Sequence, residues 1–134
     1  MRVEGSCHCG AIAYAAEIDP ATVRICHCTD CQTLTGSAYR VVVRAPAASF
    51  VLKRGAPKTY IKKTAESGVP RAHGFCPDCG TPLYAVALKD PPFYSLRLGS
   101  IKERAALLPR EQIWCRSALP WSGDLGAIAR HERE

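Results

Sequence analysis

The chain has 134 residues, about the size of one ordinary domain, and 47% of them are hydrophobic while 22% are charged. This composition excludes wholesale disorder, and no apolar run reaches the roughly 18 residues that a membrane-spanning helix needs. The formal net charge is +6, and the first ten residues contain no apolar signal region. We therefore expect a cytoplasmic protein without a membrane partner.

Short β-rich segments, separated by turn residues, predict a mainly β domain. The ten glycines and ten prolines are spread along the chain and divide it into short pieces. In chain order, strands are expected at 11–18, 39–43, 49–52, 58–62, 83–88, 93–98 and 113–114. A short helix is expected at 30–35, because Thr29 followed by Gln32 forms a capping-box pattern and Gly36 is a natural stop.

Helix is scarce in the rest of the chain. Residues 101–107 predict one or two further turns before Pro109. The last eleven residues, 124–134, are compatible with a short helix or with a frayed end. We therefore expect one domain over 1–123, followed by a C-terminal tail over 124–134.

Seven of the eight cysteines fall into three clusters. These clusters are Cys7 and Cys9; Cys26, Cys28 and Cys31; and Cys76 and Cys79. Cysteine makes up about 6% of the chain, below the roughly 8–10% that is typical of a disulfide scaffold. A reducing compartment also disfavours disulfides, so cysteines clustered in this way predict metal sites, with zinc as the metal.

The spacing within each cluster allows the thiols to converge. Residues two apart on an extended chain, or three apart on a helical turn, point to the same side. A structural zinc takes four protein ligands, whereas a catalytic zinc keeps one position open. Joining the first and third clusters completes a closed site and leaves the trio of Cys26, Cys28 and Cys31 with a vacancy. The residues that could instead fill the trio's fourth position, and so make both ions structural, are Cys115, His8, His27 and His73.

Several other residues have simpler interpretations. Cys115 lies beside Trp114 in an apolar stretch, which predicts a small buried hydrophobic side chain rather than a ligand. On an extended chain His8 and His27 would point away from the metal, which favours contact with solvent or with the surroundings of the ligands. Trp114 and Trp121 predict packing in the core or at its rim.

Metal binding would change both the net charge and the chemistry. Seven bound thiolates remove seven charges and two Zn²⁺ add four, which leaves about +3 in place of +6. This modest charge, without a basic and aromatic stripe, argues against nucleic acid as a partner. Three thiolates on one Zn²⁺ leave a net charge of about −1, which suits binding of an external thiol better than activation of water.

Four segments carry a resemblance to a known family, and they are GSCHCGA, CHCTDCQTLTGSAY, HGFCPDCGTPLY and LPREQIWCRSALPW. Together they resemble the glutathione-dependent formaldehyde-activating enzyme family, whose domain is shared with centromere protein V. The resemblance implies a small zinc-stapled β-tent fold of short antiparallel strands with one or two short helices. It implies a structural zinc on the first and third clusters, and a second zinc on the trio, which is proposed to carry the chemistry.

The resemblance also implies an activity that joins glutathione to formaldehyde and forms S-hydroxymethylglutathione. We therefore expect a zinc-dependent carbon–sulfur lyase-type enzyme with two zinc ions and a small thiol such as glutathione as its partner. The alternatives are a non-catalytic zinc module that binds nucleic acid or protein, and a zinc-stabilised scaffold with a vestigial site. Candidate proton donors are His27, Asp30 and Thr33, and candidate contacts for carboxylates of the substrate are Arg24, Arg40 and Arg44.

Overall fold

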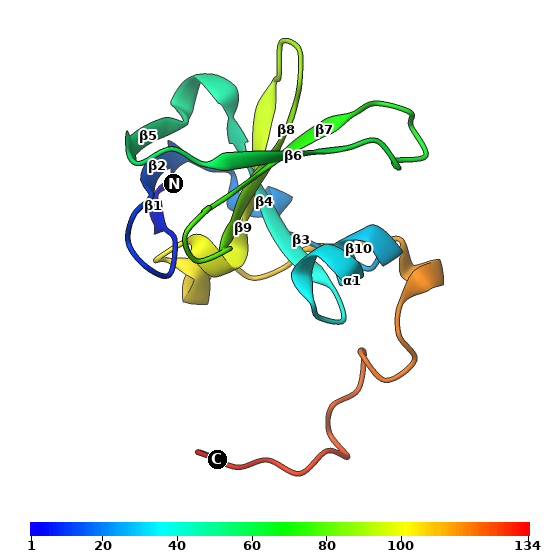
Figure 1. The fold of residues 1–134 in the computed structure, drawn as a ribbon. Helices are drawn as coiled ribbons and strands as arrows, with labels where there is room; N and C mark the ends of the chain where they lie inside the picture. The colour runs from blue at the N-terminus through cyan, green and yellow to red at the C-terminus, as the bar shows by residue number, and fades with distance from the viewer.

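The computed structural model describes residues 1–134 as two β-sheets with short helical segments between the strands (Figure 1). The smaller sheet has the order β1-β2-β5, from strands β1 (Arg2–Ser6), β2 (Ala13–Glu17) and β5 (Val51–Arg54). The larger sheet has seven strands in the order β10-β3-β4-β9-β8-β7-β6. Its strands are β3 (Arg24–Cys26), β4 (Arg40–Pro46), β6 (Lys58–Lys62), β7 (Arg71–Phe75), β8 (Pro82–Ala87), β9 (Phe93–Arg97) and β10 (Glu111–Ile113).

All neighbouring strands are antiparallel except β10 and β3, which are parallel. The predicted mainly β fold of short strands is therefore confirmed, and each of the seven expected segments overlaps a strand, with residue 114 lying beyond β10. Strands β1, β3 and β7 were not expected, because polar or charged residues, histidine or cysteine occupy alternate positions in each of them and leave few apolar residues to mark a strand.

The single α-helix, α1 (Thr29–Thr35), begins one residue earlier than the capping box predicted. Its N-cap is Cys28 rather than Thr29, because the Cys28 backbone is extended and its Sγ accepts a hydrogen bond from Cys31 N. Gln32 makes no capping box, and its Nε2 donates instead to the carbonyl oxygens of His27 and Ser117. Gly36 ends the helix in the left-handed conformation, with φ of 63°.

The remaining helical segments are single 3₁₀ turns. They are η1 (Pro20–Thr22), η2 (Ala47–Ser49), η3 (Leu98–Ser100), η4 (Arg104–Ala106) and η5 (Cys115–Ser117). The turn expected within 101–107 is therefore confirmed as η4, and residues 118–134 contain no helix or strand. This C-terminal segment runs away from the two sheets (Figure 1). No helix is long and apolar enough to span a bilayer.

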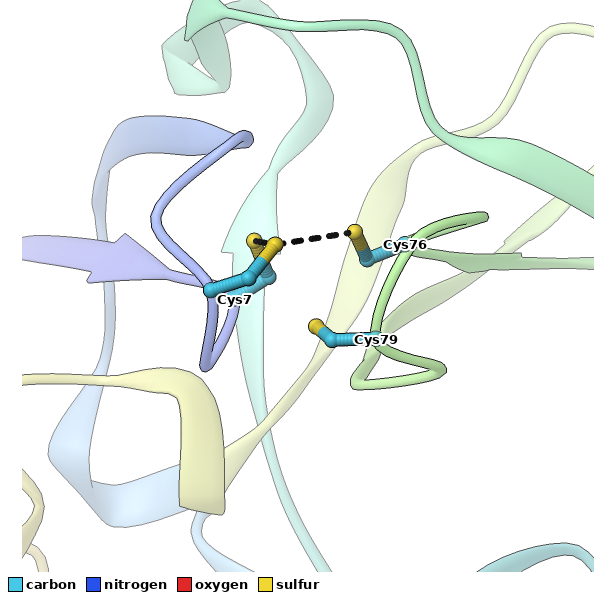
Figure 2. A group of neighbouring side chains, drawn as sticks. Cys7, Cys76 and Cys79 are labelled. Carbon is cyan, nitrogen blue, oxygen red and sulfur yellow. Dashed lines mark hydrogen bonds between the residues drawn. The ribbon is translucent and has the colours of Figure 1, made fainter.

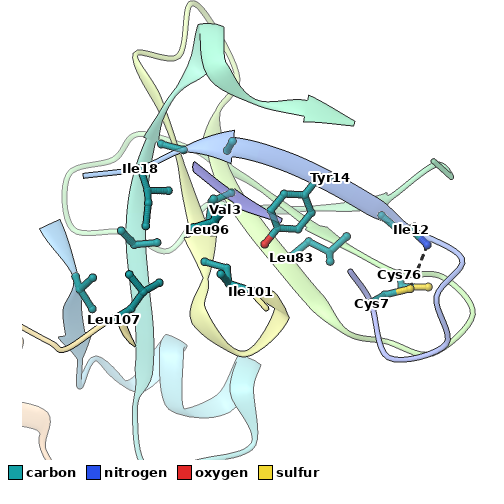
Figure 3. Close-up of a cluster of buried hydrophobic side chains, with 14 residues drawn as sticks. Val3, Cys7, Ile12, Tyr14, Ile18, Cys76, Leu83, Leu96, Ile101 and Leu107 are labelled. Atoms are coloured by element: carbon teal, nitrogen blue, oxygen red, sulfur yellow. Dashed lines mark hydrogen bonds between the residues drawn. The ribbon is translucent and has the colours of Figure 1, made fainter. Parts of the chain in front are cut away.

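The hydrophobic core lies between the two sheets and extends to the segment after β9 (Figure 3). Strand β4 illustrates how the sequence builds it, because Val43 and Ala45 are fully buried on one face. The alternate residues Arg40, Val42 and Arg44 therefore belong to the opposite face. One face of the larger sheet is thus apolar and packed, while the other carries arginines.

Candidate metal centres

The structure brings four cysteines from distant parts of the chain into one group. The Sγ atoms of Cys7, Cys9, Cys76 and Cys79 all lie within 4.8 Å of one another (Figure 2). Cys9 Sγ is 3.6 Å from Cys7 Sγ and 3.8 Å from Cys76 Sγ. Zn–S bonds of roughly 2.3 Å in a tetrahedron place sulfurs about 3.8 Å apart, so this group is compatible with zinc.

Two tight turns hold these four thiols. The turn after β1 is closed by Gly10 N donating to Cys7 O, and the turn after β7 is closed by Gly80 N donating to Cys76 O. Both glycines have positive φ, 81° and 76°, which other residues adopt only with strain. His8 N donates to Thr81 Oγ1 at 3.0 Å and so joins the two turns.

The surroundings of Cys7 favour the thiolate form of its side chain. Burial raises its pKa, but the hydrogen bond from Ile12 N and those from neighbouring thiols outweigh burial, so the net pKa is lowered. Ile12 N lies 3.2 Å from Cys7 Sγ. A thiolate held in this way is the form that a metal ion binds.

The second group contains the remaining clustered cysteines. Cys26 ends β3, Cys28 caps α1 and Cys31 lies in its first turn, and their Sγ atoms lie within 4.8 Å of one another. Hydrogen bonding from Cys26 and Cys28, together with the positive charges of Arg40 and Arg97, lowers the pKa of Cys31 to about 5 despite burial. The hydrogen bond with Cys31 and burial raise the pKa of Cys26, so the thiolate forms first at Cys31. Three converging thiols, one of them readily deprotonated, make this trio also compatible with a metal ion.

No other histidine, cysteine, aspartate or glutamate joins the trio. Cys115 is exposed on η5, so the prediction that it is a buried hydrophobic residue is wrong, because its strand ends at Ile113 and the chain turns outward. His8 is exposed, whereas the buried His27 hydrogen-bonds Gln112 Oε1 through Nε2 at 2.7 Å. His73 hydrogen-bonds Arg97 rather than reaching the sulfurs.

The trio lies at a cavity of about 250 Å³ on the arginine-bearing face of the larger sheet. Register explains this arrangement, because Cys26 pairs with Arg40, while Val42 pairs with Arg24 on one side and Arg97 on the other. Side chains on paired residues share a face of the sheet. No acidic residue lines the cavity, and its basic residues are Arg24, Arg44, Lys62, Arg71, His73 and Arg97.

The cations differ in how free they are to contact a ligand. Arg24 is paired with Glu111 at 3.0 Å, and Lys62 is paired with Asp30 at 2.9 Å. Arg44 stacks over Phe93, with its Cζ 4.5 Å from the ring centroid. Arg71 makes no ion pair, so Arg44 and Arg71 are the cavity cations best placed to receive an anion.

A second, wider depression of about 540 Å³ continues from the trio's cavity. The two share Cys28, Lys62, Arg71 and Trp114. Trp114 therefore forms a wall of the site. Of the two expected positions, core or rim, the structure excludes the core, because the Trp114 backbone is left-handed, with φ of 57°, just beyond β10. The loop between β6 and β7 supplies polar side chains to the same depression.

The positions of the other expected site residues differ. Arg40 does not line the cavity of the trio and is almost completely buried beside it, so it is not an open contact for a carboxylate. Thr33 is exposed and lines neither depression, while Asp30 is held by Lys62 and Thr64. Sequence reasoning missed three residues of the cavity, and their alternation with neutral positions in β6, β7 and β9 was the available signal: Lys62, Arg71 and Arg97. His73, expected as a possible ligand of the trio, instead lines the cavity.

Comparison with known proteins agrees with this geometry. Residues 2–117 match the family described as glutathione-dependent formaldehyde-activating enzyme. The chain belongs to this family. A Halomonas elongata protein named "Putative glutathione-dependent formaldehyde-activating enzyme" is 32% identical over 88 residues, which cover 63% of this chain and 55% of that protein. The match thus spans about half the length of this relative.

A solved structure has a similar fold. The crystal structure of a Rhodobacter sphaeroides protein aligns with a TM-score of 0.62, covering 81% of this chain and 98% of that one. Sequence identity over the alignment is 21%, so this likeness concerns the fold alone. The family membership and the two cysteine groups together define the candidate site.

Proposed function

We propose that this family member is a zinc-dependent enzyme of the carbon–sulfur lyase class that joins a small anionic thiol, of the glutathione kind, to formaldehyde. The observation that carries the proposal is the trio of converging thiols without a fourth protein ligand, placed at a basic cavity. Zinc held by Cys26, Cys28 and Cys31 would supply an open position at which a thiol binds as thiolate.

The basic lining of the cavity favours a substrate that carries carboxylates. Arg44 and Arg71 line it, and neither has an acidic partner that a substrate would have to displace. Guanidinium groups bind carboxylates through paired, charge-assisted hydrogen bonds. Glutathione carries two carboxylates, which these two arginines would bind while its sulfur lies at the trio.

His73 is suited to assist the aldehyde oxygen. Its Nδ1 lies 3.2 Å from Arg97 Nη2, which can only donate, so the ring proton of neutral His73 lies on Nε2. Burial and the charges of Arg97 and Arg40 lower the pKa of His73 to about 3, so the ring is neutral at physiological pH. A neutral imidazole N–H can stabilise a developing oxyanion by hydrogen bonding.

The chemical step is an addition. The thiolate sulfur attacks the carbonyl carbon of formaldehyde, the carbon–sulfur bond forms, and the electron pair of the carbonyl moves to oxygen. The His73 Nε2–H donates a hydrogen bond to this oxygen, which then takes up a proton from solvent. The proton lost from the thiol balances the one gained, so the reaction needs no further reactant.

The proposal is tested by exchange NMR on glutathione and formaldehyde with the metal-loaded protein. The wild-type protein should accelerate adduct formation, and Cys28→Ser should abolish the acceleration. Cys115→Ser is the matched control, because this cysteine is exposed and lies outside both groups. An unaccelerated reaction in wild-type protein with two bound metal ions would exclude this activity.

The role of Arg71 gives a second prediction. Arg71→Gln should raise KM for glutathione about tenfold, because one charge-assisted contact with a carboxylate is worth on the order of 1–3 kcal/mol. The same substitution should leave the reaction of 2-mercaptoethanol, which has no carboxylate, nearly unchanged. Steady-state kinetics with both thiols measure the difference, and an equal loss with both would contradict a carboxylate contact.

A further inference from the structure

Two arginines are buried beside the trio without a carboxylate partner. Arg40 is 4% exposed and Arg97 is 8% exposed. Neither forms an ion pair with an acidic residue, and the Nε atom of each has no hydrogen-bond partner. A buried cation is strongly unfavourable unless an opposite charge lies nearby. The fold must therefore provide a negative charge for this arginine pair.

The thiols of the trio are the groups that can supply that charge. Arg40 on β4 pairs in register with Cys26 on β3, and Arg97 on β9 lines the same cavity as all three cysteines. Arg97 also hydrogen-bonds His73, which is neutral and so contributes no charge.

Charge counting shows which ligand completes the site. A divalent metal with three thiolates carries a net charge of about −1, and an external thiolate as fourth ligand makes it about −2. The buried arginine pair carries +2, so the buried charges balance only when the fourth ligand is an anion. With water or another neutral ligand in that position, one buried positive charge remains uncompensated.

We infer that Arg40 and Arg97 are positioning residues whose buried charges make the trio's metal select an anionic thiolate over a neutral fourth ligand. This inference rests on the proposed metal at the trio, but not on the identity of the thiol or on formaldehyde. The selection is electrostatic, so it depends on the charge of residue 97 more than on its shape. The two rim arginines, Arg44 and Arg71, have a different role, because they contact carboxylates.

The experiment uses protein loaded with Co²⁺ and follows the sulfur-to-cobalt charge-transfer and visible bands. Each variant is titrated with 2-mercaptoethanol, which binds as a thiolate, and with imidazole, which binds as a neutral ligand. The neutralising variants are Arg97→Gln and Arg40→Gln, and Arg97→Lys retains the charge. Arg110→Gln is the matched control, because it removes the same charge from an exposed arginine before β10.

Both neutralising variants should bind 2-mercaptoethanol about 10- to 100-fold more weakly, as expected for unit charges several ångströms apart at an intermediate dielectric constant. Their affinity for imidazole should change less than threefold. Arg97→Lys and Arg110→Gln should stay within about threefold of wild type for both ligands. If the arginines had only a structural role, their loss would lower the affinities for 2-mercaptoethanol and for imidazole to the same extent.

Each other result overturns the inference. Equal losses for thiol and imidazole, or unchanged thiol affinity in a folded Arg97→Gln or Arg40→Gln protein, would exclude charge selection. If both neutralising variants fail to fold, the Arg97→Lys variant provides the test. A large loss of thiol affinity in this variant, which retains the positive charge, would also exclude charge selection. If the wild-type protein bound only one Co²⁺, both this inference and the proposed function would be excluded. If it bound two ions and the thiol but had no activity, only the proposed function would be excluded.

Discussion

Tyr14 is the largest side chain that the core encloses completely. Its ring is 1% exposed, and its hydroxyl hydrogen-bonds Ser100 Oγ at 2.7 Å. Burial raises the pKa of Tyr14 to about 12. In the unfolded chain the same group titrates near 10, so folding favours its protonated form.

This shift predicts how stability depends on alkaline pH. The contribution of Tyr14 is fully present below about pH 10 and is lost as pH rises toward 12, because the unfolded state then releases the proton more readily. Two pKa units correspond to about 2–3 kcal/mol. Urea unfolding between pH 9 and 12 should show a loss about 2–3 kcal/mol smaller in Tyr14→Phe than in wild type, because Tyr84, whose pKa burial also raises, still titrates in both proteins.

A matched control is Tyr60→Phe, because Tyr60 is 52% exposed on β6. This variant should keep the alkaline loss of stability that the wild type shows. A loss of the same size in Tyr14→Phe and in wild type would contradict the assigned contribution of Tyr14.

At the scale of elements, two glycines allow aromatic rings to cross neighbouring strands. Gly74 on β7 pairs with Tyr84 on β8, and Gly5 on β1 pairs with Tyr14 on β2. A Cβ on Gly74 would overlap the ring of Tyr84, and one on Gly5 would overlap the ring of Tyr14. Neither glycine has positive φ, so space for the ring, rather than backbone conformation, requires glycine here.

The prediction at this scale concerns Gly74→Ala. The added methyl group would displace the Tyr84 ring, so the free energy of unfolding should fall by about 1–3 kcal/mol. Gly123→Ala should change it by less than about 0.5 kcal/mol, because its Cβ would meet no atom within 4 Å. Urea denaturation measures both, and equal effects would contradict the packing argument.

At the scale of the whole molecule, the four-cysteine group connects the two sheets. Cys7 and Cys9 follow β1 of the smaller sheet, whereas Cys76 and Cys79 follow β7 of the larger one. The trio, in contrast, lies within one short stretch between β3 and α1. A metal ion bound by the four-cysteine group would therefore close a long loop of the chain, whereas a metal ion bound by the trio would hold only a short segment.

This difference predicts distinct effects of losing each metal. Cys76→Ser should lose one metal ion and on the order of 3 kcal/mol or more of stability, because distant segments are no longer tied together. Cys28→Ser should lose the other ion and keep a near-native circular dichroism spectrum. Metal analysis with thermal unfolding compares the two, and unfolding by Cys28→Ser with a stable Cys76→Ser would reverse the assigned roles.

The parts of the fold and of the site that could be predicted are those that depend on residues close together in the sequence. The cysteine spacings, the position of α1 and seven of the ten strands depend on neighbours in the chain, so periodicity and turn residues indicated them. The N-cap was wrong by one residue, because sulfur took the place expected for a threonine hydroxyl.

The sequence by itself therefore determined the mainly β character, the family and the grouping of the cysteines, since local pattern and ligand chemistry suffice for these. Only the tertiary structure decided that Cys115 and Trp114 leave the core, and that Arg40 and Arg97 are buried beside the trio. The physical reason is strand register, which pairs residue 26 with residue 40 and residue 42 with residue 97. Pairings between segments so far apart depend on how the whole sheet closes over its core.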